Sequence, residues 1–114
     1  MLMPRLIDSV RNGKAITLAG PDGIRITPTH VSDAVRAVLS ATRVSGSHII
    51  DVGGPEVLTI RAIAEAIGRK VECEPQYEVQ FDRGADVVAD LAAMQLRLGA
   101  PLRDLASGLD DLLA

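Results

Sequence analysis

The α/β character of this chain is decided by residues 48–67, which read HIIDVGGPEVLTIRAIAEAI. The first five residues form a short apolar run typical of a buried strand, and the Gly-Gly-Pro sequence that follows predicts a turn. Thr59 is suited to cap a helix, because its hydroxyl oxygen can accept a hydrogen bond from a free backbone amide. The apolar residues after it recur at helical spacing: Ile60, Ile63, Ala64 and Ile67. The segment therefore predicts a strand, a turn and an amphipathic helix.

The preceding half of the chain repeats this alternation. Apolar residues three and four apart predict a helix over residues 3–10, and residues 15–19 predict a short strand. Residues 24–31 predict a second extended stretch, at a sheet edge because Pro28 has no amide donor. A further helix follows, with Ser32 as its expected cap and Ser45-Gly46 as its end. Its expected core face consists of Val35, Val38 and Leu39.

The remaining residues continue in the same way. Gly68 is expected to end the helix that Thr59 begins, and residues 71–77 alternate well enough for another strand. Asp90 is expected to cap a helix that reaches Leu98. Pro101 opens a last helix, with its leucines expected to face the core: Leu102, Leu105, Leu109 and Leu112. We therefore expect a single α/β domain over residues 1–114, with about five helices and short strands.

Composition narrows the function classes. The 114 residues carry a formal net charge of −3 and only two aromatic side chains, Tyr77 and Phe81. Neither a basic field nor a stacking platform for nucleic acid is present, so we expect no nucleic-acid partner. The single cysteine, Cys73, forms no intrachain disulfide, and no cysteine and histidine cluster predicts a metal site. No run approaches the roughly 20 apolar residues of a membrane span, so we expect a cytoplasmic protein without a membrane partner.

Two local patterns resemble catalytic or cofactor sites. His30 and Asp33 lie three residues apart at a strand-to-helix junction, where they would serve as a base and its orienting partner in a small-molecule hydrolase. No serine or cysteine has the sequence context of a nucleophile, so we favour a structural role. The turn from Asp51 to Pro55 occupies the position of a phosphate-binding loop, but its glycine pattern is incomplete and Glu56 would repel phosphate. We therefore expect it to be a plain connection.

Two arginines stand apart from those on expected helix faces. Arg25 lies in the extended stretch, and Arg83 lies in a loop three residues before Asp86. A guanidinium group can hold a diphosphate through two parallel hydrogen bonds, and a carboxylate can accept hydrogen bonds from a ribose. The spacing predicts substrate-binding residues for a nucleoside diphosphate at Arg83, Asp86 and Arg25.

The same residues belong to a longer resemblance. Residues 16–33, ITLAGPDGIRITPTHVSD, resemble the block I-x-L-x-G-D-G-x-x-R-x-x-P/F-x-H-V-x-D of extended short-chain dehydrogenases, the NAD-dependent nucleotide-sugar epimerases and dehydratases. Residues 49–54 resemble the family's F-N-I-G-S-G, and residues 57–66 resemble V-S-I-x-E-L-A-E-x-I. Residues 83–86 resemble R-P-G-D, and residues 98–101 resemble L-G-W-x-P. Many family members have the first arginine one place later, where this chain has Ile26.

This resemblance implies the carboxyl-terminal lobe of an extended short-chain dehydrogenase, without its Rossmann half. It also implies a nucleotide-sugar substrate, and NAD or NADP as the cofactor of a full-length relative. The family's glycine-rich cofactor loop and Tyr-x-x-x-Lys pair are absent from the sequence. We therefore expect no catalytic residues and no cofactor in this chain, which would act as a substrate-binding domain that is inactive alone, truncated or split from its other half.

Two other expectations remain open. The chain is either that substrate-binding domain or a non-enzymatic ligand-binding or oligomerisation module that kept the fold and lost the chemistry. Loss of the Rossmann half would also expose apolar surface, for which the first helix and the last two are candidates. We therefore expect a homo-oligomer or a separate Rossmann-half partner.

Overall fold

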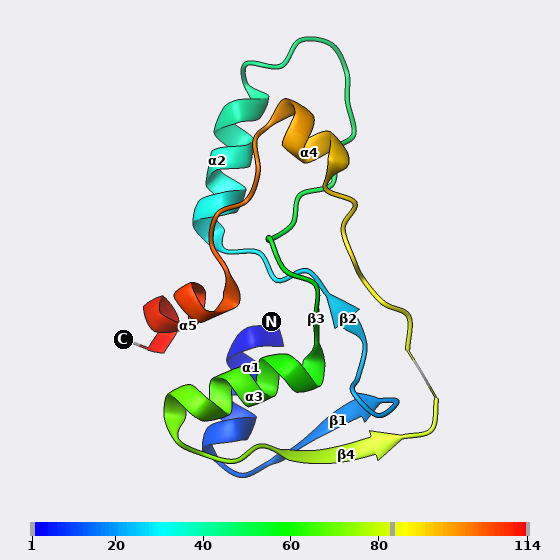
Figure 1. Cartoon of the computed structure of the whole chain (residues 1–114), viewed down its shortest axis with the longest axis vertical. Coiled ribbons are helices and arrows are strands. Elements are labelled where there is room, and N and C mark those ends of the chain that lie inside the picture. Colours follow the sequence, from blue (N-terminus) through cyan, green and yellow to red (C-terminus); the bar gives the residue numbers. More distant parts are fainter. Residues whose placement is uncertain (1, 83, 114) are drawn as a thin grey trace.

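The computed structural model describes residues 2–82 and 84–113, which form a small α/β domain. Its elements follow one another along the chain as α1 (Leu2–Arg11), β1 (Ala15–Ala19), β2 (Arg25–Ile26), α2 (Val31–Ala41), β3 (Leu58–Thr59), α3 (Ile60–Val71), β4 (Gln76–Gln80), α4 (Ala92–Arg97) and α5 (Leu105–Leu113). Figure 1 shows α1 and α3 lying over the β1 and β4 ribbon, α2 beside α4 at the other end, and α5 between the two groups.

The strands form two small sheets. β1 and β4 pair in parallel, from Ala15 opposite Gln76 to Ala19 opposite Gln80. β2 and β3 pair antiparallel, and a parallel bridge joins Ile26 to Val87 on the other side of β2. This second sheet connects the two groups of helices (Figure 1).

The main hydrophobic core lies between α3 and its neighbours. The predicted stripe of α3 is confirmed, because Ile60, Ile63, Ala64 and Ile67 are all buried. The other buried members of this core come from three elements: Leu6, Val10, Ile16, Leu18 and Leu109. The half of the molecule around α2 and α4 buries far less apolar surface, with Ala37 and Met94 as its buried hydrophobic residues among those described.

Some helix ends agree with the sequence and others differ. α2 ends at Ala41 rather than at Ser45-Gly46, and α5 begins at Leu105 rather than at Pro101. Thr59 caps α3 as predicted, and its hydroxyl accepts a hydrogen bond from the Ala62 amide at 3.1 Å. His30, not Ser32, caps α2, because its extended backbone aims the ring nitrogen at the Ser32 amide. Gly68 lies within α3, which continues to Val71 and ends at Glu72 in a left-handed conformation. Leu91 directly precedes α4, but the predicted cap Asp90 still acts at this end, because its carboxylate accepts a 3.1 Å hydrogen bond from the Ala92 amide.

Three predictions about buried surface are wrong, the third only in part. The run 48–52 forms no strand, and Ile49 is 101% exposed, because no other described segment pairs with it. The expected core face of α2 is also exposed, with Val38 67% accessible. Of the four leucines expected to face the core, Leu105 and Leu109 of α5 do so, whereas Leu112 of α5 and Leu102, which precedes the helix, are exposed. None of the described helices has the length and apolar character that crossing a bilayer requires.

Candidate functional site

The predicted substrate-binding residues meet at the rim of the second sheet. Arg25 belongs to β2, and Asp86 directly precedes Val87, whose amide donates a 2.9 Å hydrogen bond to the Arg25 carbonyl. The Asp86 carboxylate accepts hydrogen bonds from the Arg25 backbone amide at 2.8 Å and from its Nε at 3.0 Å. Residues 61 positions apart are therefore in direct contact. The third predicted residue, Arg83, lies outside the described residues.

This contact joins two groups that were predicted to hold different parts of a ligand. The Arg25 guanidinium is permanently charged, and the carboxylate beside it occupies its Nε edge. Both side chains remain accessible to solvent. Arg25 and Asp86 thus form an exposed contact with two hydrogen bonds at the end of a strand. The two terminal nitrogens of the Arg25 guanidinium take no part in these bonds and could donate to an anion.

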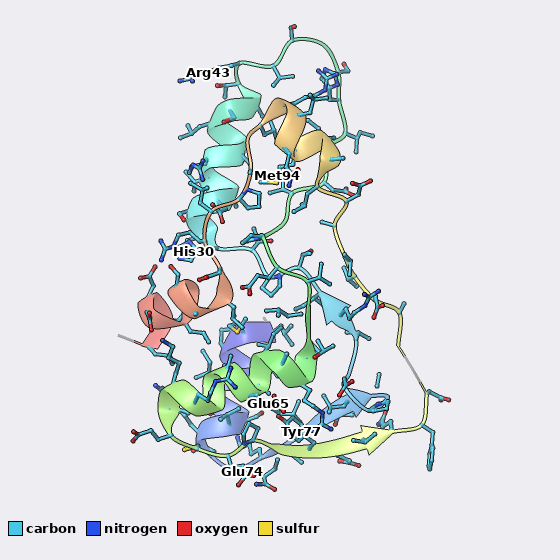
Figure 2. The ribbon with its side chains drawn as sticks, in the orientation of Figure 1. His30, Arg43, Glu65, Glu74, Tyr77 and Met94 are labelled. Atoms are coloured by element: carbon cyan, nitrogen blue, oxygen red, sulfur yellow. The ribbon has the colours of Figure 1, made fainter. Side chains whose placement is uncertain are left out.

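His30 and Asp33 form no base and orienting pair, which agrees with the structural role favoured from the sequence. His30 Nδ1 accepts a 3.0 Å hydrogen bond from the Ser32 amide and lies 2.7 Å from the Ser32 hydroxyl. Its Nε2 lies 3.0 Å from the carboxylate of Asp111, in α5. Figure 2 shows His30 at the base of α2, next to α5. The imidazole therefore caps one helix and holds another, which is a structural role.

Asp33 is instead the anchor for the segment that leads into α5. Its side chain is fully buried, and it accepts hydrogen bonds from the backbone amides of Leu102 at 3.0 Å and Arg103 at 2.9 Å. Arg36 adds a contact at 3.2 Å. Burial opposes ionisation of this carboxyl, but the two amide donors and the Arg36 charge outweigh it, so the pKa of Asp33 is lowered.

Sequence reasoning missed Arg103 and Asp111, which join this network from the segment before α5 and from α5 itself. Arg103 donates from Nη2 to Asp111 at 2.7 Å and from Nε to Ser107 at 2.6 Å. The hydrogen bond from Arg103 to Asp111, followed by the one from His30, lowers the pKa of Asp111. Asp111 lies 81 residues from His30 in the sequence, so no local sequence pattern predicts their contact.

The glycine turn between residues 51 and 55 does not fit the phosphates of a dinucleotide. Gly53 and Gly54 are both buried, and a side-chain carbon at Gly54 would overlap the carbonyl oxygen of Pro28. Glu56 accepts a 2.8 Å hydrogen bond from the Leu105 amide. The turn is thus packed against its own chain, which agrees with its prediction as a plain connection. Residues 2–82 and 84–113 also contain no group of three or more His, Cys, Asp or Glu side chains that could hold a metal ion.

An apolar groove of about 400 Å³ lies elsewhere, between α2 and the chain that follows it. Ala37 and Val38 line one side, and Ile50 and Val52 line the other. Leu98, just after α4, completes it. Neither Arg25 nor Asp86 contributes to this groove, so the polar pair and the apolar groove are separate features.

Comparisons with known proteins place the fold. No family model and no curated protein matches the sequence. Among solved structures, UDP-glucuronic acid 4-epimerase from Bacillus cereus, in complex with NAD, matches 96% of this chain and 36% of its own, with a TM-score of 0.80 and 21% identity. UDP-glucose 4-epimerase from Thermotoga maritima matches 92% of this chain and 35% of its own, with a TM-score of 0.74 and 20% identity.

UDP-N-acetylglucosamine 4-epimerase from Bacillus cereus gives a TM-score of 0.73 at 16% identity, over 98% of this chain and 39% of its own. The fold of this chain is therefore that of part of a UDP-sugar epimerase, as the sequence resemblance predicted. The chain spans little more than a third of the length of these structures.

Proposed function

We propose that this chain is the substrate-binding part of an NAD-dependent epimerase/dehydratase-like protein, equivalent to the carboxyl-terminal lobe of those enzymes. It would bind a nucleotide sugar or a related nucleoside diphosphate in the cytoplasm, and it would be inactive alone. The observation that supports this most is the match of nearly the whole chain to about a third of several UDP-sugar epimerases. NAD, which accompanies the Bacillus cereus relative, would belong to a separate half.

The proposed site consists of Arg25, Arg83 and Asp86. In favour of it, Arg25 and Asp86 come together from distant parts of the sequence at one sheet rim. Arg83 and Asp86 also keep the spacing of the family's R-P-G-D motif. We assign the diphosphate to the two arginines and the ribose hydroxyls to Asp86, which would exchange its contact with Arg25 for the ligand.

Titration calorimetry with uridine 5′-diphosphate tests this assignment. We expect the wild-type chain to bind the nucleotide and Arg83→Ala to bind it about tenfold more weakly or worse, because a hydrogen bond to a charged group contributes about 1.5–3 kcal/mol. Arg43→Ala is the matched control, since Arg43 lies at the far end of α2 (Figure 2). Addition of NAD and UDP-glucose should give no turnover. Equal affinities for wild type and Arg83→Ala would remove Arg83 from the site, and turnover would contradict an inactive lobe.

A second candidate is a non-enzymatic ligand-binding or oligomerisation module that kept the fold and lost the chemistry, and we consider it here in the form that no longer binds a nucleotide. The mutual contact of Arg25 and Asp86 favours it, because each group already satisfies the other. Ile26 stands where many members of the family have an arginine, which also favours this non-enzymatic candidate. This candidate predicts no measurable heat with uridine 5′-diphosphate for wild type or variant. In either case we propose that the chain associates with copies of itself or with a separate Rossmann-half partner.

A further inference from the structure

The contact between Arg25 and Asp86 places a carboxylate where a ligand anion would meet the arginine. Asp86 Oδ2 lies 3.0 Å from Arg25 Nε, and Asp86 Oδ1 accepts a 2.8 Å hydrogen bond from the Arg25 backbone amide. One carboxylate therefore contacts both the main chain and the side chain of the same arginine. The Arg25 side chain is 59% accessible and that of Asp86 is 36% accessible, so a dissolved ligand can reach the pair.

The main chain, rather than the arginine side chain, fixes the position of this carboxylate. The Val87 amide donates a 2.9 Å hydrogen bond to the Arg25 carbonyl, and a parallel bridge joins Val87 to Ile26. These contacts hold the segment that carries Asp86 alongside β2. When the Arg25 side chain turns toward a ligand, Asp86 stays beside it, because the bond from the Arg25 amide to Oδ1 does not involve the guanidinium.

A carboxylate fixed in this way makes Arg25 a poor site for a bare diphosphate. An anion that takes the Nε proton must displace Asp86 Oδ2, and an anion on the terminal nitrogens lies close to the same negative charge. Both arrangements bring like charges together. An exposed ion pair is weak, however, so Oδ2 exchanges its contact with Arg25 at small cost when a ligand offers it another donor.

We infer that Asp86 is a specificity-determining residue, which selects ligands that carry ribose hydroxyls as well as a diphosphate. A nucleoside diphosphate gives phosphate oxygens to Arg25 and hydroxyl donors to Asp86 Oδ2, so the carboxylate changes from an opposing charge into a hydrogen-bond acceptor. Inorganic pyrophosphate supplies the anion without the hydroxyls, so the like charges remain opposed. This inference rests on the proposed function and extends its ribose contact to discrimination against ligands that lack a ribose.

Titration calorimetry with uridine 5′-diphosphate and with inorganic pyrophosphate tests this selectivity. We expect the wild-type chain to bind the nucleotide about tenfold more tightly than pyrophosphate. Asp86→Asn removes the charge but keeps an oxygen that can accept the Arg25 amide. This variant should bind pyrophosphate about threefold more tightly than wild type does, as expected for an exposed charge contact. Its affinity for the nucleotide should rise less, because a neutral amide is a weaker acceptor for hydroxyls than a carboxylate.

The matched control is Asp110→Asn. It removes the same charge from an exposed pair with Lys70 and should leave both affinities unchanged. A circular dichroism spectrum verifies that each variant is folded. If wild type and Asp86→Asn bind the nucleotide with the same preference over pyrophosphate, the inference is wrong and the proposed function stands. If the wild type gives no heat with the nucleotide, the proposed function is wrong and the inference fails with it.

A nucleotide without ribose hydroxyls tests the same selectivity on the unaltered chain. 2′,3′-Dideoxyuridine 5′-diphosphate keeps the base and the diphosphate, so we expect the wild type to bind it about tenfold more weakly than uridine 5′-diphosphate. That difference should shrink in Asp86→Asn and persist in Asp110→Asn. Equal affinity of the wild type for the two nucleotides would show that Asp86 does not contact the ribose hydroxyls and would refute the selectivity.

Discussion

Removal of the Asp33 carboxylate should release the segment that leads into α5. The side chain is 1% exposed, and its two oxygens accept the Leu102 and Arg103 amides at 3.0 and 2.9 Å. Substitution by alanine leaves both amides without that acceptor, each at a cost of about 1–3 kcal/mol. Arg36, whose side chain is half exposed, also loses its contact, but the two unpaired amides dominate, so we expect Asp33→Ala to lower the free energy of unfolding by about 3–5 kcal/mol.

Asparagine provides a milder variant in case the alanine variant does not fold. The amide side chain retains one acceptor oxygen but turns an N–H₂ group toward the second backbone amide, so Asp33→Asn should cost about 2 kcal/mol. Urea denaturation followed by circular dichroism should then show a midpoint lower by about 1 M, for a slope near 2 kcal/mol/M. Asp110→Asn is the control, because the exposed Asp110 pairs with Lys70 at the surface and should cost about 1 kcal/mol or less.

Hydrogen exchange distinguishes this anchor from a general loss of stability. The amides of Leu102 and Arg103 should exchange much faster in Asp33→Asn than in wild type, whereas the amides of α3 should change only as global stability does. An unchanged exchange rate at those two amides, or equal costs for Asp33→Asn and Asp110→Asn, would refute the anchoring role.

The same carboxylate gives a signed dependence on pH. Its pKa is lowered in the folded state, so the folded protein binds this proton less tightly than the unfolded chain does. The stabilisation is complete above the unfolded value of about 3.9 and is lost as the pH falls through the folded pKa. Acid unfolding of Asp33→Asn should therefore lack this contribution, and the difference in stability between wild type and variant should shrink below about pH 4.

Two further substitutions test other parts of the packing. Tyr77 of β4 lies near Glu65 of α3 (Figure 2). Burial and the Glu65 charge raise the pKa of Tyr77. Its hydroxyl is buried and makes no hydrogen bond with any described residue. Tyr77→Phe should therefore leave the free energy of unfolding unchanged or raise it by up to about 1 kcal/mol. A loss above 1 kcal/mol in urea denaturation would reveal a hydrogen bond at that hydroxyl. Gly54→Ala should destabilise by about 3 kcal/mol or more, because the new methyl overlaps the Pro28 carbonyl. A thermal midpoint equal to that of wild type would show that residues 28 and 54 do not approach each other closely.

Sequence alone was sufficient where one element carries its own signal. The stripe of α3 and its Thr59 cap were predicted correctly, because spacing and a capping hydroxyl act within a single helix. β1 was also predicted with its observed bounds, residues 15–19. β4 lies further along the chain than predicted, since an alternating pattern specifies faces more sharply than it specifies ends.

The candidate site was only partly readable from sequence. The motif spacing pointed to Arg25, Arg83 and Asp86, but it gave no indication that Asp86 would contact Arg25 directly. His30 and Asp33 were correctly singled out as a pair of polar residues at a junction. Their partners, Asp111 and the amides before α5, come from the other end of the chain and depend on tertiary packing.

The sequence determined which residues share one face of an element. Only the tertiary structure decided whether another part of the molecule covers that face. Val35, Val38 and Leu39 share one side of α2 as their spacing predicts, yet they are exposed. Ile49 lies in an apolar run that favours a strand, yet the run has no described partner. Periodicity is a property of one segment, whereas burial and strand pairing require a second surface at the right distance, which no local pattern contains.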